Sequence, residues 1–173
     1  MKKILSLTLA LIFVLFLAAV AQGTASKTVK DMTIITTNAE GLIIYIDDED
    51  EDALVELDKL MADGAEVYFG EEVMSKAREL LEKDEVEVTE YAAIFVANYK
   101  EEMGDVVANM LFPTRVEEGR KAVMLIGLKN SEDEYEWKEY EAIGVEDGSM
   151  DVLFDGETLQ RIQDETGMFA LVL

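Results

Sequence analysis

From residue 85 to residue 173, apolar and polar side chains mostly alternate with the period of β-strands. Gly, Asp, Asn and Glu residues separate the apolar runs, as is typical of turns between short strands. Leu159 and Ile162 instead have helical spacing, so a helical turn is predicted at residues 158–164, between the last two strands. Short strands at regular intervals predict a β-sandwich or barrel. The predicted strands are residues 86–88, 91–99, 106–112, 121–128, 135–143, 150–154 and 168–173.

A β-hairpin is predicted before these strands. β-branched residues dominate residues 32–37 and 42–46, and such runs favour extended strands. Between them lies the sequence Asn-Ala-Glu-Gly, in which Asn and Gly accept the positive φ of a tight loop. The two strands are therefore expected to pair with each other.

Two amphipathic helices are predicted after the hairpin. In residues 49–63 the apolar side chains recur at helical spacing, acids occupy the first turn, and Gly64 follows the last turn. Residues 32–84 are thus expected to form the hairpin and two helices, and residues 85–173 the sandwich. The clearer helix is at residues 70–83, with an apolar stripe formed by Val73, Met74, Ala77, Leu80 and Leu81.

Three of the predicted strands have apolar residues on both faces, which a sheet with one face in water does not require. The clearest case is residues 122–128, where no side chain is polar. Residues 92–97 and 168–173 show the same pattern. The stripe of the 70–83 helix is expected to cover the outer face, which makes the protein one α+β unit. The alternative is that a partner covers this apolar face.

Four segments of the C-terminal half combine strand patterns with a turn. They are FPT at residues 112–114, GRKAVMLIGL at 119–128, EW at 136–137 and EDGSMDV at 146–152. In these segments the chain resembles the Ig-like β-sandwich modules of exported proteins from Gram-positive anaerobic bacteria. The likeness covers residues 86–173. It implies an Ig-like antiparallel β-sandwich with a structural or adhesive role, and it implies no site residues.

The first 21 residues have the pattern of an export signal. Two lysines precede a long apolar run that ends in Ala19-Val20-Ala21, the small-x-small pattern that signal peptidase cleaves. The alternative is a membrane anchor, because about 20 apolar residues can span a bilayer. The small-residue end of the run favours cleavage, so we expect a secreted protein with no stable membrane insertion. The small and polar residues 22–31 are expected to form a flexible N-terminus.

The composition limits the chemistry that this protein can perform. The chain has no Cys and no His, which excludes Cys-His and Ser-His-Asp catalysis, thiol redox chemistry and the usual zinc, copper and haem sites. No cofactor is therefore expected. The formal charge is −23, and it becomes −25 without residues 1–21, which carry two lysines and no acids. Such a polyanion repels phosphates, so nucleic acid is not an expected partner.

The densest acidic run holds six consecutive Asp and Glu residues, and it is a candidate calcium site. Asp48, Asp50 and Asp52 match the first ligands of a calcium loop, and Ca²⁺ is held by several carboxylate oxygens. Ala53 stands where such a loop has Gly, and Lys59 where it has a bidentate Glu. The other interpretation is a solvated helix start whose acids complement the helix dipole.

A second candidate site surrounds the single Trp. Strand alternation places Tyr135, Trp137 and Glu139 on one face. Two aromatic rings beside a carboxylate suit stacking on a sugar, so these three are candidate ligand-binding residues. The alternative is that Trp137 is a core residue between two sheets.

These features predict an exported, non-catalytic binding or structural module that acts at or outside the cell surface, with a protein or a glycan as its ligand. Oligomerisation into a surface assembly is left open. The alternative function is a small secreted hydrolase, because two carboxylates at a suitable separation suffice for glycoside hydrolysis. The sequence has no Gly-rich phosphate loop and no nucleophile elbow, so binding is the favoured prediction.

Overall fold

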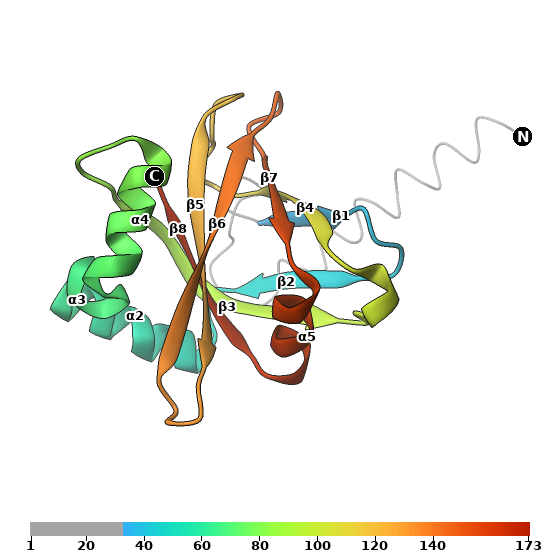
Figure 1. The fold of residues 1–173 in the computed structure, drawn as a ribbon, viewed down its shortest axis with the longest axis horizontal. Coiled ribbons are helices and arrows are strands. Elements are labelled where there is room, and N and C mark those ends of the chain that lie inside the picture. Colours follow the sequence, from blue (N-terminus) through green and yellow to red (C-terminus); the bar gives the residue numbers. More distant parts are fainter. Residues whose placement is uncertain (1–32) are drawn as a thin grey trace, which may run out of the picture. The chain divides into compact units, whose positions relative to one another are not determined.

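The computed structural model describes residues 33–173. The predicted export signal at residues 1–21 and the segment 22–31 lie outside this part. Within it, eight strands and four α-helices build an α+β protein, as predicted (Figure 1). The helices are α2 (Glu51–Asp63), α3 (Ala65–Phe69), α4 (Glu71–Leu81) and α5 (Gly156–Asp164), with a short 3₁₀ helix, η2 (Glu101–Met103). The strands are β1 (Ile34–Thr37), β2 (Ile43–Asp47), β3 (Val88–Ala97), β4 (Val106–Leu111), β5 (Lys121–Lys129), β6 (Tyr135–Gly144), β7 (Met150–Phe154) and β8 (Gly167–Val172).

All eight strands belong to one antiparallel sheet in the order β1-β4-β7-β6-β5-β8-β3-β2. The two edge strands, β1 and β2, contact each other, so the sheet is nearly barrel-shaped. The Ig-like sandwich is not confirmed, because one strongly curved sheet encloses its own apolar face and no second sheet is needed to cover it. The predicted hairpin is not confirmed either: β1 pairs with β4 and β2 pairs with β3.

The main core lies inside the curved sheet. Inward-facing residues of the strands fill it, including the stacked rings of Phe112 and Phe169, whose centroids are 5.1 Å apart. Helix α5 packs its apolar side against this core through Leu159 and Ile162, which are both buried. The helical turn predicted at residues 158–164 is therefore a complete helix that starts two residues earlier.

A second core lies between the outer face of the sheet and helices α2, α3 and α4. Met74, Ala77 and Leu81 of α4 are buried there, and Val73 and Leu80 are partly buried. Their neighbours in this core include the outward-facing residues Val123, Leu125, Met168, Ala170 and Val172. The prediction that the 70–83 stripe covers the outer face is confirmed. Helix α3 was not predicted, because five residues are too few to show a helical period.

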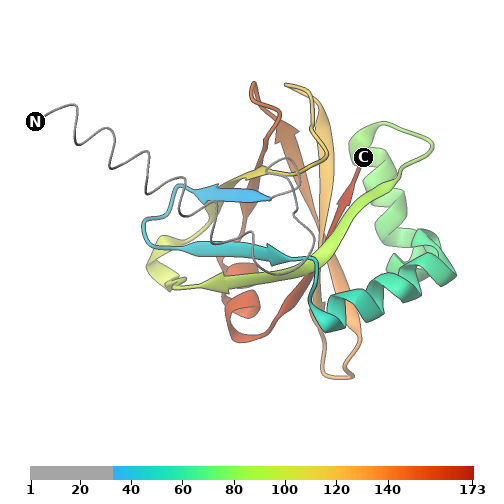
Figure 2. The same ribbon diagram turned by 180° about the vertical axis from the view of Figure 1, so that it is seen from behind.

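The helices leave one side of the sheet uncovered. Figure 2 shows β1 and β2 on the side away from α2, α3 and α4. Outward-facing apolar residues on this side stay exposed, among them Ile34, Ile43 and Leu153. Within residues 33–173, no helix has the length and hydrophobicity needed to cross a bilayer.

Candidate functional site

Trp137 is at the centre of a group of aromatic rings between the sheet and α3. Its ring lies 4.7 Å from that of Phe69, centroid to centroid, in an edge-to-face arrangement. It also covers Gly127 on the neighbouring strand, where a Cβ atom would lie only 2.8 Å from the indole. Tyr68, Tyr91 and Tyr135 complete the group. Trp137 is therefore used for packing, although it packs against a helix and not between two sheets.

A hydrogen-bonded chain anchors these rings to helix α2. The Tyr68 hydroxyl donates to Glu56 Oε2 at 2.8 Å, and its oxygen lies 2.7 Å from the hydroxyl of Tyr91. Burial raises the pKa of both phenols. Both hydroxyls thus stay protonated and serve as neutral links between α2, α3 and the sheet.

Glu139 faces helix α4 and not the aromatic group. Its Oε1 atom lies 3.5 Å from Lys76 Nζ, an ion pair whose field raises the pKa of Lys76. The same oxygen is buried and makes no hydrogen bond with any described residue. Tyr135, Trp137 and Glu139 share one face of β6 as predicted, but only Tyr135 and Trp137 belong to the aromatic group, whereas Glu139 pairs with Lys76 of α4.

Tyr135 lines an open pocket of about 540 Å³ at the β5–β6 turn. Because its residues come from the start of α2, the β5–β6 turn, the end of α5 and the start of β8, the pocket exists only in the folded protein. Asp52, a calcium candidate, and Tyr135, a ligand candidate, both belong to it. Its remaining residues are Lys129, Asn130, Ser131, Asp133, Arg161, Glu165, Thr166 and Met168.

The two basic side chains of the pocket, Lys129 and Arg161, already bond to other groups of the protein. Lys129 Nζ lies 2.8 Å from Asp133 Oδ1 and 5.7 Å from the centre of the Tyr135 ring. The hydrogen bond with Asp133 raises the pKa of Lys129. Arg161 donates from Nη2 to the carbonyl oxygen of Lys129 at 3.1 Å, and burial raises the pKa of Tyr135. These contacts fix the turn and the Tyr135 ring.

Other polar groups of the pocket remain available to a ligand. Within residues 33–173, no side-chain hydrogen bond and no ion pair is formed by Asp52, Ser131, Glu165 or Thr166. The negative charge of Asp52 does act on its pocket neighbours Lys129 and Tyr135. The four side chains offer two carboxylates and two hydroxyls beside one aromatic ring. Such a surface can accept several hydrogen bonds from a ligand that is rich in hydroxyl groups.

The three calcium candidates do not form a common cluster. Asp50 caps helix α2, because its Oδ1 accepts hydrogen bonds from the amides of Asp52 and Ala53, both at 3.0 Å. Asp52 lines the pocket instead. Within residues 33–173, no group of three or more acidic side chains is arranged to hold a metal ion.

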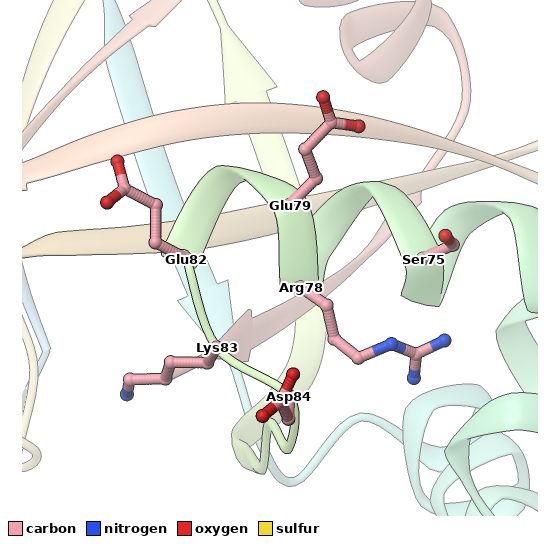
Figure 3. A pocket seen from close by; sticks show the side chains of 6 residues that line it. All are labelled: Ser75, Arg78, Glu79, Glu82, Lys83 and Asp84. Atoms are coloured by element: carbon pink, nitrogen blue, oxygen red, sulfur yellow. The ribbon is translucent and has the colours of Figure 1, made fainter.

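A second pocket, of about 390 Å³, runs along the outer side of α4 and the turn that follows it. Figure 3 shows its charged side chains pointing in different directions: Glu79 and Glu82 extend to one side of the helix, and Arg78 and Asp84 to the other. Arg78 is also paired with Glu66 of α3. Because its polar groups do not converge, this pocket is not the candidate site.

A partly buried polar network attaches the start of α5 to β6. Asp155 caps the helix by accepting from the Thr158 amide at 3.0 Å, and its Oδ2 lies 2.6 Å from Lys138 Nζ and accepts from the Tyr140 hydroxyl at 2.5 Å. Burial alone would raise the pKa of Asp155. The hydrogen bonds from Lys138, Tyr140 and Thr158 outweigh this effect and hold the pKa well below its usual range. The network positions α5, whose last turn carries Arg161 into the pocket.

We expect Asp155→Asn to lower the free energy of unfolding at neutral pH, and we expect the difference from wild type to shrink in acid. A carboxylate with a depressed pKa stabilises the fold above its unfolded pKa of about 3.9, and this contribution is lost as the pH falls below that value. Asparagine keeps the capping acceptor but not the charge. Urea unfolding between about pH 6 and 2 measures the difference, and Asp164→Asn on the same helix controls for the lost charge. A difference that is constant over this range would contradict the prediction.

Sequence reasoning missed the pocket residues Lys129, Arg161 and Glu165. The signal for the first was the polar turn between two predicted strands, in which Lys129 and Asp133 are four residues apart. No local signal marked Arg161 and Glu165, which reach the pocket only because the fold brings the end of α5 to the end of β5, where Arg161 donates to the carbonyl oxygen of Lys129. No protein-family model, curated protein or solved structure matches this chain.

Proposed function

We propose that this protein is an exported, non-catalytic binding module that holds a glycan in the pocket around Tyr135. The observation that carries the proposal is the convergence of four separate chain segments on an aromatic ring with unengaged carboxylates and hydroxyls. The volume of about 540 Å³ is within the range of small-ligand sites, which is about 300–1,000 Å³. Export is proposed from residues 1–21.

The chemistry of the pocket favours a neutral or amino sugar over an anionic ligand. Asp52 and Glu165 accept hydrogen bonds from hydroxyl or ammonium groups, and the Tyr135 ring gives an apolar surface for the carbon face of a sugar. Lys129 is paired with Asp133, so it adds little attraction for a phosphate or sulfate. The formal charge of −23 on the whole chain also repels anionic ligands.

Tyr135→Ala is expected to weaken the binding of the best oligosaccharide by at least about tenfold, because hot-spot aromatic residues carry 1–2 kcal/mol or more. Chemical-shift titration of the secreted domain with neutral and amino oligosaccharides measures the affinity of each variant. Tyr45→Ala is the matched control, since Tyr45 is an exposed tyrosine outside the pocket, stacked on Phe95. We expect this variant to bind like wild type.

A second pair of variants tests the carboxylate. Asp52→Asn is expected to weaken binding, whereas Asp58→Asn, an exposed acid on the same helix but outside the pocket, is expected to have no effect. Equal effects from both variants would overturn the assignment of this pocket. Release of shortened oligosaccharides by the wild type, abolished in Asp52→Asn or Glu165→Gln, would instead support the hydrolase.

A further inference from the structure

Among the strands of residues 33–173, β1 and β2 form the two edges of the sheet, and these edges lie next to each other. Within the same residues, no backbone hydrogen bond joins the two strands. We call these two edges the seam. An edge strand leaves alternate N–H and C=O groups unpaired, which makes it a template for another strand.

Apolar side chains on both faces of the seam are incompletely covered. Ile35 and Ile46 point toward the main core but are only partly buried. On the outer face Ile34, Ile43 and Tyr45 are 47%, 51% and 48% exposed. An added strand would cover residues of both sets, because its side chains alternate between the two faces.

The charge around the seam indicates what kind of segment fits it. Asp47 ends β2, and the acidic residues that follow it continue to the start of α2. Basic residues in an added segment would therefore meet opposite charges beside the end of β2. A second copy of this chain would bring the same charge of −23, which opposes self-association.

We infer that the seam binds an extended basic segment of a partner protein, which adds to the sheet as a further strand. Backbone hydrogen bonds supply affinity in this mode, and alternate side chains supply specificity. An antiparallel strand is slightly more stable than a parallel one, so the segment runs antiparallel to β2. Its basic residues then lie at its N-terminal end, next to Asp47, and the following residues alternate between apolar and polar. The inference is independent of the glycan pocket.

The probe is a synthetic peptide with lysines at its N-terminal end, followed by alternating Val and Thr. We expect its fluorescence polarisation to report binding to wild type, and we expect Ile43→Lys to weaken that binding by at least about tenfold, because the substitution removes apolar contact and adds a like charge. Ile143→Lys is the matched control. Ile143 is 46% exposed on β6, away from the seam, and the substitution makes the same change in charge.

Further measurements separate this inference from its rivals. Amide shifts and exchange protection on peptide addition are expected in β1 and β2, and a peptide with Glu in place of Lys is expected not to bind. Affinity should fall with added salt, because exposed charges are screened. Equal loss in both variants, shifts confined to the tyrosine pocket, binding of the Glu peptide, or concentration-dependent dimers of the free protein would each overturn the inference.

Discussion

Phe169→Ala is expected to lower the free energy of unfolding by about 3–5 kcal/mol, the typical cost of truncating a buried phenylalanine. Phe169 is fully buried in β8, with Ala92 and Ile126 beside it on the neighbouring strands. Its ring is stacked almost parallel to that of Phe112. Truncation leaves a cavity at the centre of the curved sheet, where rigid strands on both sides prevent collapse. Urea or guanidinium unfolding measures the change.

Phe169→Leu is the control for this prediction. It keeps most of the apolar volume and is expected to cost clearly less than the alanine variant. If Phe169→Ala cost under about 1 kcal/mol, the residue would behave like a surface position. The inward-facing core described above would then be wrong.

Ala77→Asp, in the second core, is expected to lower the free energy of unfolding by a comparable amount. Ala77 lies on the side of α4 that faces the sheet, and it is completely buried. A carboxylate there would be buried against apolar residues, and burying an unpaired charge is among the few changes that destabilise a protein by more than about 3 kcal/mol. We expect a large loss of unfolding free energy and faster amide exchange in α4 and on the covered strands.

The matched control is Ser75→Asp, which adds the same charge to the exposed side of the same helix. Its expected effect is within about 0.5 kcal/mol, because it removes no packing. Similar losses in the two variants would mean that the added charge, and not the burial of α4, is responsible. The contrast therefore tests directly whether α4 covers the outer face of the sheet.

Local periodicity was sufficient for most of the secondary structure. The strand predicted at residues 150–154 is β7, with the same bounds, and the apolar stripe at 70–83 is α4. Because the run at 122–128 is apolar on both faces, a helix was predicted to cover its outer face, and this prediction is confirmed. The break predicted after residue 88 does not occur, because β3 continues through this region with a shift in its pairing to β8.

The candidate site was predicted only in part. Tyr135 and Asp52 were singled out for different ligands, and the fold brings them to the same pocket. Asp50 proved to be a helix cap, as the alternative interpretation of the acidic run anticipated. Glu139 faces Lys76 of α4, a contact between residues 63 positions apart in the sequence. Nothing in the sequence near either residue indicates it.

The sequence by itself determined most of the strands and helices and which of their faces are apolar, because these depend on side chains that are close together in the chain. Only the tertiary structure decided that β1 pairs with β4 and β2 with β3, that the strands form one sheet, and that Arg161 and Glu165 join Tyr135. The physical reason is that a hydrophobic period specifies the face of a strand but not the neighbour at its edge. Backbone hydrogen bonds are the same for every strand, so the partner is chosen by how the whole set of apolar faces can be buried at once.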